Sequence, residues 1–117
     1  MKTITMCTGK LHRVKVTQAR LDYEGSVTLY PVLMEAVGIM PYQLVHINNM
    51  ANAVHWETYA IPGEPNSGVV CLNGCPARLF QPGDEVIILS LEQMSREEAK
   101  GVQPIVVQVD HLNNIRV

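Results

Sequence analysis

Short stretches of alternating hydrophobic and polar residues run along most of the chain, and this period of two predicts β-strands. The first clear stretch covers residues 10–16, where Leu11, Val14 and Val16 stand among polar neighbours. Residues 85–90 form an almost unbroken apolar run, as in a buried strand. Further strands are expected over residues 26–29, 44–48, 56–61, 69–72 and 104–109.

Helices are expected to be few and short. Residues 32–37 predict a helix that ends at Gly38, and Ser95 with Glu98 forms a capping-box pattern for a single helical turn. The tail from His111 is expected to fray. Turns are predicted over residues 49–53, 62–68, 73–74 and 82–84, the third of them as a hairpin turn.

Six or seven short strands with two small helices predict a mainly β fold, a compact β-barrel. The length of 117 residues suits one domain, spanning residues 1–117, with a single hydrophobic core. Hydrophobic residues make up 47% of the chain and charged residues 17%, which is typical of a globular protein. Periodicity leaves the type of barrel open.

Charge and hydropathy exclude several classes of partner. The net charge is −2, and without a basic stripe the protein is not expected to bind nucleic acid. No apolar run approaches the roughly 18 residues of a membrane helix, so no membrane partner is expected. The first residues lack the pattern of a signal peptide, and we therefore expect a cytoplasmic protein.

Cysteine and histidine residues are few. The odd number of cysteines argues against a disulfide framework, and Cys71 and Cys75 lack the second pair of a typical zinc site. We expect His12 to be a satisfied core or interface residue rather than a general base. The histidines show no metal-binding spacing, so no metal is expected; they are His12, His46, His55 and His111.

The dipeptide Gly25-Ser26 becomes informative through its surroundings. Alone, Gly-Ser is a common turn sequence. Together with other segments, in an order and spacing that match through about Pro104, it resembles the bacterial aspartate 1-decarboxylases. The segments that carry the resemblance are residues 9–17 (GKLHRVKVT), 21–26 (LDYEGS), 58–61 (TYAI), 72–74 (LNG) and 83–88 (GDEVII).

The resemblance implies a double-psi β-barrel that cuts itself between Gly25 and Ser26. The serine hydroxyl can attack the carbonyl of Gly25, since this residue is unhindered and tolerates unusual dihedral angles. Elimination from the resulting ester, followed by hydrolysis, would leave a pyruvoyl group derived from Ser26. The products would be a β chain of residues 1–25 and an α chain of residues 26–117.

The same resemblance implies that the covalent pyruvoyl group is the cofactor. It would take the role that pyridoxal phosphate has in other decarboxylases, and no metal would be needed. Its carbonyl would form a Schiff base with a small amino-acid substrate and withdraw electrons as carbon dioxide leaves. Tyr59 is implied as the proton donor, with Thr58 and Lys10 as helpers. Because Thr58 faces away from Tyr59 on an ideal strand, the site would need a twisted strand or a subunit seam.

The resemblance also implies a homotetramer with active sites between subunits, and some relatives need a maturation factor. The implied substrate-binding positions are His55, Thr58, Asn73, Gly74, Cys75 and Pro76. Departures from the family fall here. His55 stands where the family usually carries an arginine that clamps a substrate carboxylate, and Asn48 stands where it often has an aromatic residue. Cys75 and Pro76 replace two alanines, which narrows the pocket and removes a backbone donor.

Three hypotheses about function follow. The leading one is decarboxylation of L-aspartate to β-alanine and carbon dioxide, in pantothenate biosynthesis. The second is decarboxylation of a different amino acid, because the departures lie at the substrate-binding positions. The third belongs to another class: an unprocessed, non-catalytic barrel that binds a small ligand.

Overall fold

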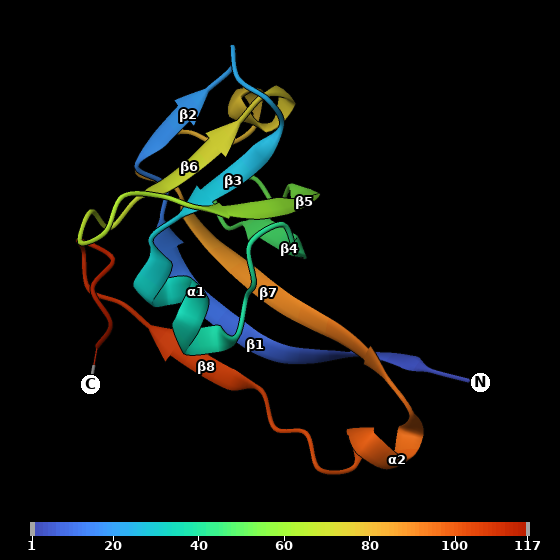
Figure 1. The fold of residues 1–117 in the computed structure, drawn as a ribbon. Helices are drawn as coiled ribbons and strands as arrows, with labels where there is room; N and C mark the ends of the chain where they lie inside the picture. The colour runs from blue at the N-terminus through green and yellow to red at the C-terminus, as the bar shows by residue number, and fades with distance from the viewer. Residues whose placement is uncertain (1, 117) are drawn as a thin grey trace.

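The computed structural model describes residues 2–116 as a mainly β, barrel-like fold (Figure 1). Eight strands form one mixed sheet in the order β2-β6-β3-β5-β4-β7-β1-β8. This result confirms the predicted mainly β class. The strands are β1 (Ile4–Lys15), β2 (Gln18–Arg20), β3 (Ser26–Leu29), β4 (Leu44–Asn49), β5 (His55–Pro62), β6 (Val70–Asn73), β7 (Glu85–Met94) and β8 (Ile105–Gln108). Between them lie the helices α1 (Pro31–Val37) and α2 (Arg96–Ala99) and the 3₁₀ helix η1 (Cys75–Arg78).

Two long strands, β1 and β7, pair antiparallel and extend past the body of the molecule on the side of the N-terminus (Figure 1). Strands β4 and β5 continue the sheet from β7, and β8 pairs in parallel with the other edge of β1. At the far end of the sheet, β3, β6 and β2 lie side by side. The two parts of the sheet are joined because β3 pairs in parallel with β5.

One face of the curved sheet and the helix α1 enclose the hydrophobic core. Strand β7 shows the pattern clearly, since Val86 and Ile88 are fully buried while Ile87 and Leu89 are only half-buried. The apolar run of β7 therefore faces the core on one side only. The largest fully buried side chains are Phe80, Leu11, Leu29, Leu33, Ile47, Leu72 and Ile88.

Both predicted helix signals are confirmed. Pro31 lies in the first turn of α1, where its missing N–H leaves no hydrogen bond unmade, and Gly38 ends the helix with a φ of 74°. At α2, the Ser95 hydroxyl accepts the N–H of Glu98 and the Glu98 carboxylate accepts the N–H of Ser95, each at 3.1 Å. Among residues 2–116, no helix is both long and apolar enough to span a membrane.

The predicted hairpin turn at residues 73–74 is wrong. Asn73 belongs to β6, and Gly74, with a φ of 82°, is the N-cap of the 3₁₀ helix η1 rather than part of a hairpin. Strand β6 pairs with β2 and β3, not with the next strand in sequence. Asn-Gly favours positive φ wherever it stands, and here that preference serves a strand-to-helix junction.

The predicted fraying of the tail is also wrong. Asn113 is buried and holds the tail against the barrel through three hydrogen bonds of 2.8 Å. Its amide accepts the N–H of Lys15 and donates to the carbonyls of Lys15 and Gly68. Beyond it, Arg116 donates its N–H to the carbonyl of Gln108. These polar contacts leave no hydrophobic pattern, which is why the sequence did not indicate them.

Candidate functional site

Ser26 begins β3 with its side chain buried and held by two neighbours. It is only 1% exposed. Its hydroxyl donates to the carbonyl of Glu24 at 3.2 Å and accepts a hydrogen bond from the side-chain amide of Asn73 at 2.9 Å. The hydroxyl that the sequence predicts as the nucleophile therefore lies beside the Gly25 peptide, with an amide donor on its other side.

Asn73 is held in one orientation by a third contact. The thiol of Cys71 donates to Asn73 Oδ1 at 3.2 Å, which turns Nδ2 toward β3. Nδ2 then donates to both Ser26 and Thr28, each at 2.9 Å. Burial raises the pKa of the Cys71 thiol, and this favours the protonated form that can donate. Strands β3 and β6 thus hold a buried polar network around Ser26.

Gly74 lies against the residue that precedes Ser26. A Cβ at position 74 would approach the Gly25 Cα to 3.0 Å and the Gly25 nitrogen to 3.2 Å. Among the described residues, positive φ occurs at Gly74 and not at Gly25, and a Cβ at position 25 would meet nothing within 4 Å. Glycine's tolerance of unusual dihedral angles is therefore needed at Gly74. In the uncut chain it is not needed at Gly25, where the sequence had predicted it.

Tyr59 lies next to Ser26 across the parallel pair of β3 and β5. Val27 is paired with Ala60, so Ser26 and Tyr59 each stand one residue before that pair. Val27 and Ala60 both face the core, and their preceding residues therefore share the opposite face. Adjacent strands are about 4.8 Å apart, so positions 26 and 59 are neighbours on one face of the sheet. The centre of the Tyr59 ring lies 6.1 Å from that of Tyr42.

Arg20 extends this row of residues on the other side of Asn73, and the sequence had given no reason to single it out. Ser26 is paired with Asn73, and Asn73 with Arg20, so Arg20, Asn73, Ser26 and Tyr59 form one row across β2, β6, β3 and β5. The Arg20 guanidinium lies 4.9 Å from the ring centre of Tyr23. Both side chains line a cavity of about 550 Å³, together with Thr28, Ile61, Glu64 and Cys71.

The single chain does not bring Thr58 or Lys10 to this row. Thr58 is paired with Val45 in an unshifted register, so it faces away from Tyr59. Lys10 is on β1, four places from β3 in the sheet order. On the same strand, Nδ1 of His12 is buried and has no hydrogen-bond partner among residues 2–116. Within one chain His12 is therefore not a satisfied core histidine, and its place at a subunit interface stays a prediction.

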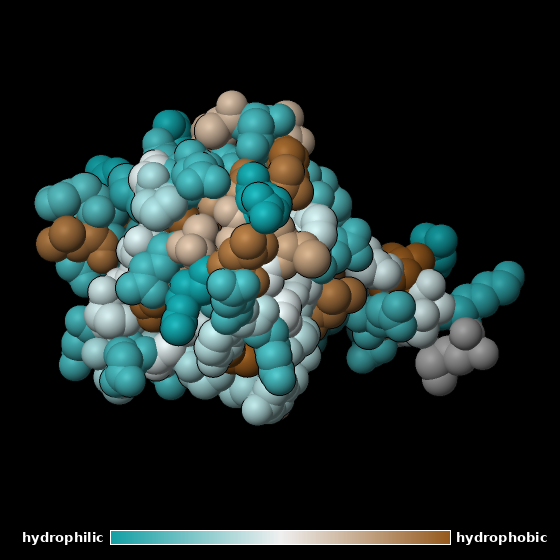
Figure 2. Space-filling model, turned by 90° about the horizontal axis from the view of Figure 1, so that it is seen from above, coloured by the Kyte–Doolittle hydropathy of each residue, from teal (hydrophilic) through white to brown (hydrophobic). Residues whose placement is uncertain are grey.

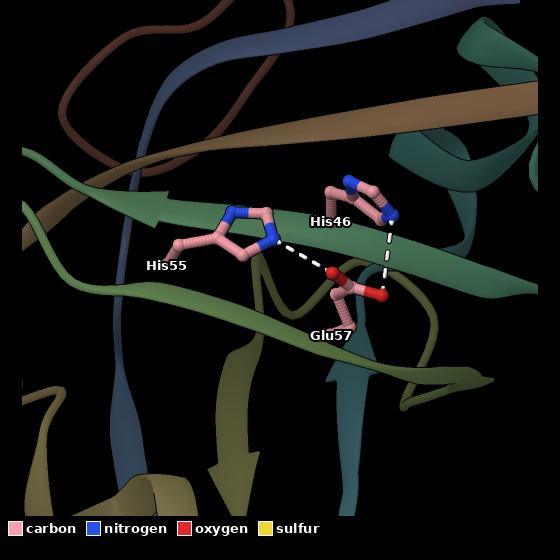
Figure 3. A group of neighbouring side chains, drawn as sticks. All are labelled: His46, His55 and Glu57. Atoms are coloured by element: carbon pink, nitrogen blue, oxygen red, sulfur yellow. Dashed lines mark hydrogen bonds and ion pairs between the residues drawn. The ribbon is translucent and has the colours of Figure 1, made fainter.

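His55 lies on the same face of β5 as Tyr59 but has its own set of partners (Figure 3). Its Nδ1 lies 2.7 Å from Asn48 Oδ1, and its Nε2 lies 2.9 Å from Glu57 Oε2. The other carboxylate oxygen of Glu57 is 3.5 Å from His46 Nε2. The hydrogen bond from His55 and the charge of His46 lower the pKa of the Glu57 carboxyl.

Cys75 and Pro76 form the start of η1, directly after Gly74. Pro76 is buried in the first turn of this helix, where a backbone N–H is not needed, so the departure from two alanines is compatible with the local fold. Cys75 is exposed, and it is a free thiol like Cys7 and Cys71. The helix η1 thus follows directly on Gly74, which lies against Gly25.

Comparison with known proteins gives the family. A family model described as aspartate decarboxylase matches residues 1–116. An aspartate 1-decarboxylase of Clostridium beijerinckii is 50% identical over 113 residues, which cover 97% of this chain and 91% of the relative. Aspartate 1-decarboxylases of Ruminiclostridium cellulolyticum and Bacillus velezensis are 50% and 51% identical, over 96% and 95% of this chain and 88% and 87% of the relatives.

These relatives, together with the barrel-like fold and the buried serine at the start of a strand, identify the class of protein as a small carboxy-lyase. The chain belongs to the aspartate decarboxylase family. The resemblance stated from the segments around Gly25-Ser26 is thereby confirmed. The hypothesis of a non-catalytic barrel is not favoured.

Proposed function

We propose that this protein converts L-aspartate to β-alanine and carbon dioxide, using a pyruvoyl group that it makes from its own Ser26. The observation that carries the proposal is the buried contact between the Ser26 hydroxyl and the Asn73 amide, in a chain of the aspartate decarboxylase family. The relatives named as aspartate 1-decarboxylases support L-aspartate as the substrate.

Self-cleavage starts with attack of the Ser26 oxygen on the carbonyl carbon of Gly25. The C–N bond of that peptide breaks, the Ser26 nitrogen takes up a proton, and an ester joins the two residues. Loss of the Ser26 Hα then expels the Gly25 carboxylate from Cβ. Addition of water and loss of ammonia leave a pyruvoyl group on residues 26–117, with residues 1–25 as the second chain.

Asn73 is the donor best placed to assist this cleavage. Its Nδ2 lies 2.9 Å from Ser26 Oγ, and the Cys71 thiol holds the amide in that orientation. This contact holds the Ser26 oxygen in place beside the Gly25 carbonyl, and a nucleophile held in position reacts faster. The same amide fits a carbonyl group at position 26 after cleavage, so the residues present suit the cofactor.

The pyruvoyl group supplies an electron-withdrawing carbonyl that, once condensed with the substrate amine, accepts the electrons left by departing carbon dioxide. The chain itself must then return a proton to the substrate carbon. We assign this step to Tyr59, whose phenol is on the same face as position 26 and one strand away. A phenol is protonated at neutral pH and can therefore donate.

We assign one substrate carboxylate to Arg20. This guanidinium is in the row that contains Ser26 and lines the cavity beside Thr28 and Cys71. At the position where the family usually has an arginine, both ring nitrogens of His55 already have oxygen partners, and one of these is the Glu57 carboxylate. A second carboxylate there would meet like charge, so Arg20 is the better partner.

Lys10 and Thr58 support an assembly in which neighbouring copies complete each site. Within one chain Thr58 faces away from Tyr59 and Ser26, and the strand that carries Lys10 is four places from β3 in the sheet. Figure 2 shows hydrophobic side chains scattered over the surface seen from above, and several large apolar residues are exposed. We propose a homotetramer with active sites between subunits; the most exposed of these apolar residues are Tyr42, Met40, Leu112, Leu44, Val106 and Ile105.

Intact-mass spectrometry tests the self-cleavage. The purified protein should separate under denaturing conditions into residues 1–25 and a pyruvoyl-capped 26–117, whereas Ser26→Ala should stay one chain of 13.0 kDa. A wild-type chain that stays whole after long incubation and after addition of cell extract would refute the proposal. Cleavage in extract alone would reveal a maturation factor. Release of carbon dioxide from a panel of amino acids then tests the substrate.

A further inference from the structure

A second cluster of chemically active side chains lies on the outer face of β4 and β5. His46 is directly paired with Glu57, and His55 with Asn48, across the antiparallel strands. One ligand atom from each of His46, His55 and Glu57 lies within 4.8 Å of the other two. Figure 3 shows both imidazole rings directed toward the same carboxylate.

The geometry points to a binding site for a transition-metal dication such as Zn²⁺, formed by His46, His55 and Glu57. Two imidazole nitrogens and one carboxylate are a common ligand set for Zn²⁺ and related ions. The ligand set disfavours Mg²⁺ and Ca²⁺, which prefer oxygen ligands throughout. This inference does not depend on the decarboxylase activity, because metal binding can be measured without turnover.

Asn48 orients one ligand for this role. Its Oδ1 lies 2.7 Å from His55 Nδ1, so Nδ1 carries the proton and Nε2 faces Glu57. Histidines that bind metals usually donate their second ring N–H to an oxygen in this way. The contact supports His55 as a ligand through Nε2 rather than as an ordinary surface histidine.

The Glu57 carboxylate lies between the two imidazole rings. His55 Nε2 is 2.9 Å from one of its oxygens, and His46 Nε2 is 3.5 Å from the other. A dication bound among these atoms would replace both contacts with bonds to a single ion.

The surroundings leave the site accessible. The side chains of His55 and Glu57 are about half exposed, at 47% and 48%. The residue of β7 paired with His46 is the apolar Leu89, and Lys10 of β1 lies beyond it. Three protein ligands leave at least one position for water or for a carboxylate.

Co²⁺ is the probe for the test, because its visible absorption distinguishes four- or five-coordination from the hexaaqua ion. The full chain carries Cys75→Ser, so that the exposed thiol does not compete. We expect one Co²⁺ per chain and its displacement by Zn²⁺. His46→Gln and Glu57→Gln should each weaken binding at least about 10-fold, and Asn48→Ala about 10- to 100-fold.

His111→Gln is the matched control, since this exposed histidine lies outside the cluster. It should bind Co²⁺ like the parent protein. Glu57→Gln is nearly isosteric and exposed, so a loss of binding there is not a loss of folding; circular dichroism checks this. Unchanged binding in both His46→Gln and Glu57→Gln, or a hexaaqua spectrum in the parent, overturns the assignment.

Discussion

The side-chain amide of Asn73 donates at once to the hydroxyls of Ser26 and Thr28, each at 2.9 Å. One donor group thus connects the residue proposed as the nucleophile with a neighbour on the same face of β3. Because both hydroxyls accept from this one amide, variants of Asn73 and of Thr28 can be compared. The comparison separates a role of Asn73 in cleavage from a role in packing.

Replacement of Asn73 by alanine should slow self-cleavage by about 100-fold, because the Ser26 hydroxyl loses the contact that holds it in position and misplacement of a reacting group has an effect of this order. Thr28→Val removes the other hydrogen bond and leaves the Ser26 contact, so it should cleave much faster than Asn73→Ala. The fraction of cut chain over time, from intact mass, measures both. Equal rates in the two variants would contradict the assigned role of Asn73.

Gly74→Ala should destabilise the fold and impede cleavage. The backbone at Gly74, with φ 82° and ψ −143°, lies in a region almost confined to glycine, which costs about 1–3 kcal/mol for a residue with a Cβ. The new methyl group would also lie 3.0 Å from the Gly25 Cα. Gly25→Ala has open space around its Cβ and is the control for folding. Urea denaturation should give a lower midpoint for Gly74→Ala than for Gly25→Ala, and the reverse order would contradict the contact.

Arg20→Gln should raise the KM for aspartate with a smaller effect on kcat. A hydrogen bond to a charged group contributes about 1.5–3 kcal/mol, which corresponds to roughly 10- to 150-fold in KM. Arg96→Gln on α2, an exposed arginine outside the row, should leave KM unchanged. Steady-state kinetics on fully cleaved protein measures both constants. An unaltered KM in Arg20→Gln would show that Arg20 does not bind the substrate carboxylate.

Asn113→Ala should lower the free energy of unfolding by about 1–3 kcal/mol, because the buried N–H of Lys15 and two carbonyl groups lose their partner. Its φ of 64° adds to the effect, since asparagine tolerates this region better than alanine does. His111→Ala, at an exposed polar residue of the same tail, is the control. Equal denaturation midpoints for the two variants would disprove the anchoring.

Acid should loosen the same tail. The backbone N–H groups of Leu112 and Asn114 donate to the Asp110 carboxylate and lower the pKa of Asp110 below its ordinary value of 3.8. The carboxylate therefore stabilises the folded tail at pH values above about 3.8, and this contribution is lost as the pH falls through the lower folded-state pKa. Amide exchange at Leu112 and Asn114 should rise there, and Asp110→Asn should abolish the pH dependence.

Local patterns predicted most elements of the fold. The strand at residues 26–29 and the glycine that ends α1 depend on neighbours in sequence, and both are found where expected. The three-residue strand β2 was missed because it is too short to show alternation and exists through its pairing with β6. The tail was misjudged for a related reason, since Asn113 is held by polar contacts with distant residues.

The site could be predicted only in part. Ser26 and Tyr59 were found through motifs, but the row that includes Arg20 depends on a parallel pairing between segments about 50 residues apart. Single-sequence periodicity carries no information on such a pairing. The cluster of His46, His55 and Glu57 was within reach, because a hairpin folded at the predicted turn over residues 49–53 pairs position 46 with 57 and 48 with 55.

Strand β1 lies between β7 and β8, so the segment before Gly25 supplies an interior strand of the sheet, second from its edge. Self-cleavage would therefore change the molecularity of folding. One subunit of the uncut protein can fold as a single polypeptide before copies assemble, whereas a cut subunit must first bring two polypeptides together, so even its own folding depends on concentration. Cleavage would therefore make unfolding effectively irreversible at high dilution. The barrel would fold while the chain is still whole, and a cut molecule that unfolds at low concentration would refold inefficiently.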